Sequence, residues 1–121
     1  MKNREQSISV VIPAKDEQAS LPGVIQDIKA GLLGVPGSHE IVVVDNNSKD
    51  NTRRVSLEGG ARVVSELLPG YGVALMRGIT EAQGDIVITG DADGTYPFLR
   101  IPELVREYNA RGVQFLNTNR R

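Results

Sequence analysis

The chain has 121 residues, 40% of them hydrophobic and 24% charged, which suits one folded domain at most and excludes intrinsic disorder. Its formal net charge of −1 excludes the basic surface that nucleic acids require, so we expect no nucleic-acid partner. Cysteine is absent and His39 is the single histidine, which excludes disulfides, thiolate catalysis and multi-histidine metal sites. No segment approaches the roughly 20 apolar residues of a membrane-spanning helix, and we expect a cytoplasmic chain.

The amino-terminal part of the chain predicts a strand, a helix and a second strand. Residues 8–12 are a β-branched run closed by Pro13, as in a buried strand that ends in a loop. Ser20 is a suitable helix cap, and the helix ends in the glycine-containing region 31–37. The apolar residues of this helix recur at helical spacing: Leu21, Val24, Ile25, Ile28 and Leu32. Residues 40–45 are mainly aliphatic, as expected for a parallel strand covered by helices on both faces.

The same alternation continues after this second strand. A polar loop over residues 46–52 leads into a short helix, which we expect to be capped near Ser48 and ended by Gly59 and Gly60. Residues 61–64 predict a third, short strand. A helix follows, with apolar or small residues on one face at Ala74, Leu75, Gly78, Ile79 and Ala82.

The last predicted elements complete the fold class. Residues 86–88 indicate a buried fourth strand that stops at Gly90. Pro102 opens a further helix, Gly112 suits the left-handed position at its end, and residues 113–116 predict a fifth strand. Four alternations of strand and helix predict an α/β fold, with a Rossmann-like, mostly parallel sheet and helices on both faces.

Three predicted strand ends carry polar clusters, at residues 13–17, 45–52 and 91–95. In a parallel sheet all three fall on the edge where open α/β folds bind their ligands. Asp91 and Asp93 offer two hard oxygen ligands, whose mutual repulsion a divalent cation would relieve. The alternative is a solvated turn, because Asp and Gly are common turn residues.

Other polar residues at this edge each leave two interpretations open. Asp45 could hydrogen-bond a ribose or a base, or it could cap the next helix. Glu17 could reach the site, or it could be a first-turn acid that favours the helix dipole. Lys15 could neutralise a phosphate or remain solvated. The segment Gly70-Tyr71-Gly72 could let backbone N–H groups approach a phosphate, or it could be a plain turn.

Four motifs in order carry a family resemblance: VIPAKDE at 11–17, IVVVDNNSKDNT at 41–52, GYGVALMRG at 70–78 and GDADGTYP at 90–97. Together they resemble the amino-terminal half of a family 2 glycosyltransferase of the GT-A fold. Within that family they are most similar to the branch of dolichol- or polyprenyl-phosphate mannosyl- and glucosyltransferases. The resemblance implies metal-dependent transfer of a sugar from a UDP- or GDP-sugar to an acceptor, in this branch a polyprenyl or dolichyl phosphate at a membrane surface.

The resemblance also assigns roles to residues of the donor site. Pro13, Ala14 and Glu17 match positions that line the nucleoside pocket, Asp45 matches the aspartate that contacts the base, and we count Gly72 with the nucleotide-sugar site. The triplet Asp91-Ala92-Asp93 matches the DxD motif, whose carboxylates hold Mg²⁺ or Mn²⁺ against the donor diphosphate. Such a cation makes the nucleoside diphosphate a better leaving group because it neutralises the developing charge.

Two features depart from the family pattern. Asn46 stands where many relatives have a second acid after the aspartate. The chain also ends at Arg121, about where the family continues into its acceptor-binding half, so we expect residues 1–121 to be the donor-binding domain of a longer protein. We expect the catalytic base, where one is needed, in that second half, and a peripheral position at the inner membrane face for the parent. An exposed sheet edge would favour homo-oligomers.

Two alternatives to the transferase remain at this point. One is a nucleotide-binding α/β fragment without turnover. The other is a haloacid dehalogenase-type phosphatase that needs Mg²⁺, with Asp91 as nucleophile and Asp93 as acid and base. The position of the motif disfavours the phosphatase, because too few residues follow Thr95 to hold the later motifs of that superfamily.

Overall fold

The computed structural model describes residues 6–111 and 116–117. Within these residues five parallel strands form one sheet in the order β3-β2-β1-β4-β5. The strands are β1 (Ile8–Ala14), β2 (His39–Asp45), β3 (Arg62–Ser65), β4 (Ile86–Thr89) and β5 (Leu116–Asn117). The helices are α1 (Leu21–Leu32), α2 (Thr52–Glu58), α3 (Tyr71–Glu81), the 3₁₀ turn η1 (Phe98–Arg100) and α4 (Ile101–Arg111). The predicted α/β class is confirmed.

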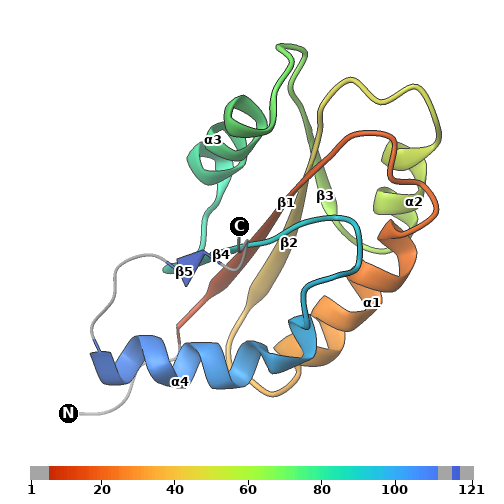
Figure 1. The fold of residues 1–121 in the computed structure, drawn as a ribbon. Helices are drawn as coiled ribbons and strands as arrows, with labels where there is room; N and C mark the ends of the chain where they lie inside the picture. The colour runs from red at the N-terminus through yellow and green to blue at the C-terminus, as the bar shows by residue number, and fades with distance from the viewer. Residues whose placement is uncertain (1–5, 112–115, 118–121) are drawn as a thin grey trace.

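Helices cover both faces of the sheet, with α1, α2 and α4 on one side and α3 on the other (Figure 1). Alternate residues of each strand feed the two cores, because successive side chains of a strand point to opposite faces. In β1, Val10 and Ile12 pack toward α1, while Val11 packs toward α3. The predicted apolar face of α1 is buried in the first of these cores.

The first strand is longer than predicted, since β1 runs through Pro13 to Ala14. Pro13 pairs in register with Val44 of β2, whereas β4 pairs with β1 only as far as Val11. The carbonyl of Val11 faces β4, where it accepts a bond from Gly90 N at 3.3 Å. The backbone nitrogen of Pro13, which carries no hydrogen, therefore points past the end of β4. Its missing N–H costs no hydrogen bond between the two strands there.

The helix starts show where local sequence signals were misread. We expected α2 to be capped near Ser48, but it begins at Thr52. The carboxylate of Asp50 accepts the N–H of Thr52 at 2.9 Å and also its hydroxyl, which fixes the first turn. These bonds lower the pKa of Asp50, with the Thr52 hydroxyl as the main cause. Ser20 does precede α1, as predicted, but its side chain makes no cap bond.

A close helix contact brings the start of α3 to the carboxyl end of the sheet. A Cβ atom at Gly78 would lie 2.3 Å from Val11 Cγ1 and 2.8 Å from Val44 Cγ2, so α3 packs on the sheet at a distance that only glycine permits.

In the described part of the chain, no helix combines the length and the apolarity needed to cross a membrane. Gly112 and residues 113–115, which we assigned to a helix end and a strand, lie outside the described residues.

Candidate functional site

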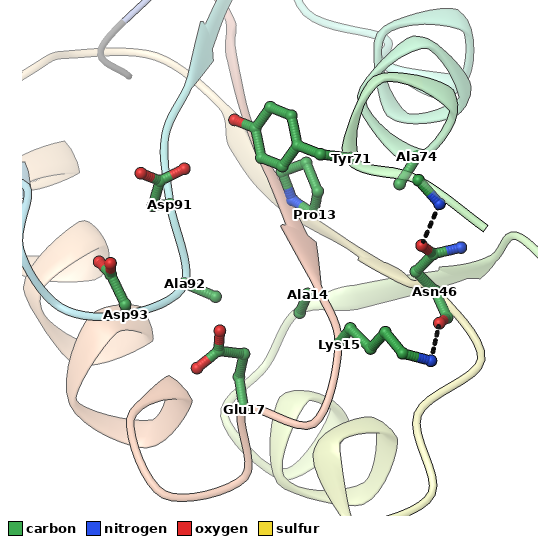
Figure 2. Close-up of a pocket in the computed structure, with 11 residues that line it drawn as sticks. Pro13, Ala14, Lys15, Glu17, Asn46, Tyr71, Ala74, Asp91, Ala92 and Asp93 are labelled. Atoms are coloured by element: carbon green, nitrogen blue, oxygen red, sulfur yellow. Dashed lines mark hydrogen bonds between the residues drawn. The ribbon is translucent and has the colours of Figure 1, made fainter. Parts of the chain in front are cut away.

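A pocket of about 410 Å³ lies at the carboxyl ends of β1 and β4. From β1 the chain continues to β2 on one side, and from β4 it continues to β5 on the other, so the two loops diverge at this point. Open α/β sheets bind ligands at such a switch point. The pocket is lined by Pro13, Ala14, Lys15, Glu17, Asn46, Gly70, Tyr71, Ala74, Asp91, Ala92 and Asp93 (Figure 2).

The loop after β4 is a tight turn that presents two carboxylates. Asp93 Oδ1 accepts the N–H of Thr95 at 3.0 Å and its hydroxyl at 2.7 Å. Gly94 follows with φ of +85°, a conformation that suits glycine. The Ser20 hydroxyl donates to the carbonyl of Ala92 at 2.6 Å, which ties this turn to the start of α1. Asp91 and Asp93 of this turn line the same pocket as Glu17.

The loop after β1 is bonded to the loop after β2 by hydrogen bonds in both directions. The N–H of Asp16 donates to Ser48 Oγ at 2.9 Å, and the N–H of Lys49 donates to Asp16 Oδ1 at 2.7 Å. The N–H of Glu17 donates to Thr52 Oγ1 at 2.8 Å. Both loops contain a residue with positive φ, Asp16 in one and Asn47 in the other. This mutual bonding holds the Glu17 side of the pocket in place.

Six of the eight predicted donor-site residues line the pocket: Pro13, Ala14, Glu17, Asp91, Ala92 and Asp93. Asp45 and Gly72 are not among the lining residues. Asp45 is the last residue of β2, is 9% exposed, and accepts the N–H of Ser48 at 3.1 Å. Gly72 lies in the first turn of α3, beside Val73 on a separate surface hollow. The binding roles of all eight residues remain predictions.

The pocket also contains residues that the predicted site left out. Tyr71 and Ala74 of α3 line it together with Gly70. Of the segment Gly70-Tyr71-Gly72, the first two residues line the pocket and Gly72 does not. Lys15 lines the pocket as well, with Nζ 3.4 Å from the carbonyl of Asn47. Asn46, considered above only as a missing acid, is a lining residue with several bonds.

The donor atoms in the pocket fit Mg²⁺ or Mn²⁺. Glu17, Asp91 and Asp93 supply carboxylate oxygens, the chain has no cysteine, and His39 lies at the opposite end of the sheet. Among the described residues no group of three or more acidic or histidine side chains is close enough to hold an ion without help. Mg²⁺ commonly binds one or two carboxylates together with substrate phosphates, so a pair such as Asp91 and Asp93 is a sufficient protein contribution.

Comparison with known sequences gives a family. The sequence model described as glycosyl transferase family 2 matches residues 9–121. An uncharacterized glycosyltransferase of Mycobacterium bovis is 38% identical over 115 residues, which are 95% of this chain and 49% of that protein. An undecaprenyl-phosphate 4-deoxy-4-formamido-L-arabinose transferase of Pseudomonas fluorescens is 36% identical over 107 residues, 83% of this chain and 31% of that enzyme. The chain thus spans from 31% to 49% of the length of these relatives.

Solved structures give a consistent result. Glucosyl-3-phosphoglycerate synthase from Mycobacterium tuberculosis, crystallised with Mn²⁺ and uridine-diphosphate-glucose, superposes with a TM-score of 0.73 at 34% identity. That match covers 88% of this chain and 40% of the synthase. Mannosyl-3-phosphoglycerate synthase from Rubrobacter xylanophilus superposes with a TM-score of 0.66 at 31% identity, covering 73% of this chain and 31% of that one. The expected GT-A architecture is confirmed by these likenesses.

Proposed function

The chain belongs to glycosyl transferase family 2, and we propose that it forms the donor-binding part of an enzyme that transfers a sugar from a nucleotide-diphosphate sugar to an acceptor. The observation that carries this proposal is the pocket at the switch point between β1 and β4, whose lining includes Asp91, Asp93 and Glu17. The family membership favours a transferase over the phosphatase alternative, which relied on the motif Asp91-Ala92-Asp93-Gly94-Thr95 after an apolar strand.

Residues that line the pocket, and Asp45 next to it, each have a part in binding the donor. Pro13 and Ala14 provide an apolar surface for the nucleoside, and Glu17 accepts hydrogen bonds from it. Asp45, at the end of the neighbouring strand, bonds the base. Asp91 and Asp93 hold the cation, which when bound neutralises charge on the donor diphosphate.

Two further residues complete this assignment. Gly72 lies in the first turn of α3, where its backbone N–H is not used by the helix and is available to a phosphate oxygen. Ala92 separates the two acids and is itself 4% exposed, which keeps the turn packed against α1. We assign no catalytic residue within this chain.

The donor is a uridine diphosphate sugar and the acceptor a polyprenyl phosphate. Support for the donor comes from the mycobacterial synthase that was crystallised with uridine-diphosphate-glucose. Support for the acceptor comes from the relatives named as undecaprenyl-phosphate transferases. A phosphate acceptor is already ionised near neutral pH, so its oxygen can attack without a general base. An enzyme with this acceptor works at a membrane surface.

Calorimetric titration of the 121-residue chain with UDP and with GDP, each with and without Mn²⁺, tests the donor site. We expect UDP to bind more tightly than GDP and to require the cation. Circular dichroism of the same sample establishes that the chain is folded. A folded chain that binds neither nucleotide with Mn²⁺ would contradict the donor site in these 121 residues. Binding without transfer of sugar would identify the fragment as a nucleotide-binding unit.

A further inference from the structure

Asn46, the residue after β2, is buried, with an exposed fraction of 6%, and its side chain makes three hydrogen bonds. Its Nδ2 donates to the carbonyl oxygens of Glu66 at 2.7 Å and Leu68 at 2.8 Å. Its Oδ1 accepts the N–H of Gly70 at 3.1 Å. Carbonyl oxygens can only accept and a backbone N–H can only donate, so these partners fix the orientation of the amide.

The segment that Asn46 holds, residues 66–70, connects β3 to α3, and at its start the N–H of Glu66 also donates to the carbonyl of Asp45 at 3.0 Å. Leu67 is 71% exposed and Leu68 is 64% exposed, so their apolar side chains add little burial to the connection. The backbone N–H of Leu68 is bonded to the carboxylate of Glu66, within the same segment. Beyond Glu66, the bonds from Asn46 to Leu68 and Gly70 join this connection to the sheet near its carboxyl end.

The position of the segment decides where α3 begins. Gly70 precedes the first residue of α3, and its carbonyl accepts the N–H of Ala74 at 3.1 Å. Tyr71 and Ala74, in the first turn, form one wall of the pocket with Gly70 (Figure 2). The backbone N–H of Asn46 donates to the carbonyl of Ala14, a lining residue from β1, at 2.9 Å. Asn46 thus bonds to a lining residue of β1 and to the residue before α3.

We propose that Asn46 is a positioning residue for the nucleotide-sugar site, because its amide fixes the Gly70-Tyr71 wall relative to the Ala14 wall. This inference rests on the proposed function. A carboxylate cannot replace the amide here. It has no hydrogen to donate, and it would place an anionic oxygen beside the carbonyl oxygens of Glu66 and Leu68.

The test compares Asn46→Asp with Asn47→Asp in the full 121-residue chain. Asn47 is the matched control, since it is adjacent and exposed and receives the same change of charge at a positive φ that aspartate also tolerates. Titration with UDP in the presence of Mn²⁺ measures affinity, and amide hydrogen exchange measures opening of residues 66–71. For Asn46→Asp we expect binding at least about tenfold weaker and exchange at least about tenfold faster. Asn47→Asp should match the wild type in both.

A neutral variant, Asn46→Ala, separates loss of the bonds from the added charge. It removes all three bonds, and we expect it to show the same two defects while circular dichroism remains that of the wild type. If Asn46→Asp does not fold, Asn46→Ala decides by the same measurements. Wild-type affinity and wild-type exchange in Asn46→Ala would overturn the proposal. An equal loss of binding in Asn47→Asp would also overturn it, because charge near the pocket would then govern affinity.

The failure of this inference is distinguishable from failure of the proposed function. If the wild-type chain does not bind UDP with Mn²⁺, the donor site is contradicted, while the exchange rates still report whether Asn46 holds the connection. The ring resonances of Tyr71 give a further readout, since we expect nucleotide to shift them in the wild type. At the same UDP concentration they should shift less in Asn46→Asp. An equal shift in that variant would contradict the positioning role.

Discussion

The two ends of the sheet use carboxylates for different purposes. At the amino edge, formed by the first residues of the strands, Glu40 accepts bonds from the Ser9 hydroxyl, the Gln83 N–H and the Arg62 guanidinium. At the carboxyl edge, formed by the strand ends and the loops that follow, Asp91 and its neighbours line a pocket. The amino edge connects strands to one another, whereas the carboxyl edge gathers oxygen atoms around a space that a ligand can enter.

The surroundings of Glu40 explain why its carboxylate is structural. Burial by itself would raise the pKa of Glu40, but the hydrogen bonds from Ser9, Gln83 and Arg62 and the charge of Arg62 together hold it below its usual value. The Arg62 guanidinium also donates to the carbonyl of Glu81 at 2.8 Å, which extends the cluster to the end of α3. The comparison therefore predicts that amino-edge changes alter stability and carboxyl-edge changes alter binding.

The largest expected effect is on nucleotide binding in Asp93→Asn. The amide oxygen can still accept the bonds from Thr95, so the turn is retained, but the negative charge that we propose holds the cation is lost. We expect affinity for UDP with Mn²⁺ to fall roughly 100-fold, because metal contacts of this kind contribute several kcal/mol. Calorimetry measures the loss, and the melting temperature should stay close to that of the wild type.

Asp85→Asn is the matched control, since Asp85 lies before β4 at the amino edge and Asp93 lies after it. Asp85 accepts bonds from the N–H and hydroxyl of Ser7, far from the pocket. Its replacement should leave UDP affinity unchanged. Equal losses in Asp85→Asn and Asp93→Asn would show that net charge, and not position at the carboxyl edge, determines binding.

The next effect in size is on stability, in Glu40→Gln. The amide oxygen keeps one acceptor, but its NH₂ group faces donors from Ser9, Gln83 or Arg62 and leaves at least one of them without a bond. We expect the free energy of unfolding to fall by about 1–2 kcal/mol, as measured by urea denaturation. Affinity for UDP should be unchanged once the fraction of folded protein is taken into account. A loss of UDP affinity that remains after this correction would contradict the separate roles that we assign to the two edges.

A smaller effect on stability and binding is expected where Ser20, before α1, is bonded to the loop after β4. Ser20→Ala removes the bonds from Ser20 Oγ to the Ala92 carbonyl and to Glu17 Oε1, and it leaves the α1 start intact because Ser20 makes no cap bond. We expect about 1 kcal/mol less stability and UDP binding weakened a few-fold. Ser7→Ala, at the amino edge, should affect stability alone. Unchanged binding in Ser20→Ala would show that the turn after β4 holds its shape without this tether.

Much of this architecture could be predicted from sequence because its signals are local. The β-branched runs, the glycine punctuation and the acids after the strands placed Asp91, Asp93 and Glu17 at one edge. The features that were missed depend on partners distant in the chain. Asn46 is bonded to Glu66, Leu68 and Gly70, which no local pattern indicates, so it was interpreted only as a missing charge.

The errors in predicted helix starts also arise because side chains bond to residues distant in the chain. Ser48 has the composition of a helix cap, but its hydroxyl accepts the N–H of Asp16 from another loop. The start of α2 is set by Asp50 and Thr52 instead. Asp45 was correctly placed at the carboxyl edge, where it pairs with Ala14, but its carboxylate accepts a bond from its own loop. Sequence alone could not rank these bonds.

The smallest expected effect is the pH dependence of the Glu40 contribution. Because the pKa of Glu40 is lowered in the folded state, its stabilisation is complete above the unfolded value of about 4.3. It is lost as pH falls through the folded pKa, where the protonated carboxyl no longer accepts all its bonds. Other carboxylates with lowered pKa values, such as Asp50, are present in both wild type and Glu40→Gln, and their effects cancel in the difference. Urea denaturation of both proteins at pH 7 and about pH 3 should therefore show a stability difference that is largest at pH 7 and shrinks in acid. A difference that stays constant would mean that Glu40 stabilises the amino edge by its shape and neutral hydrogen bonds, and that its charge contributes little.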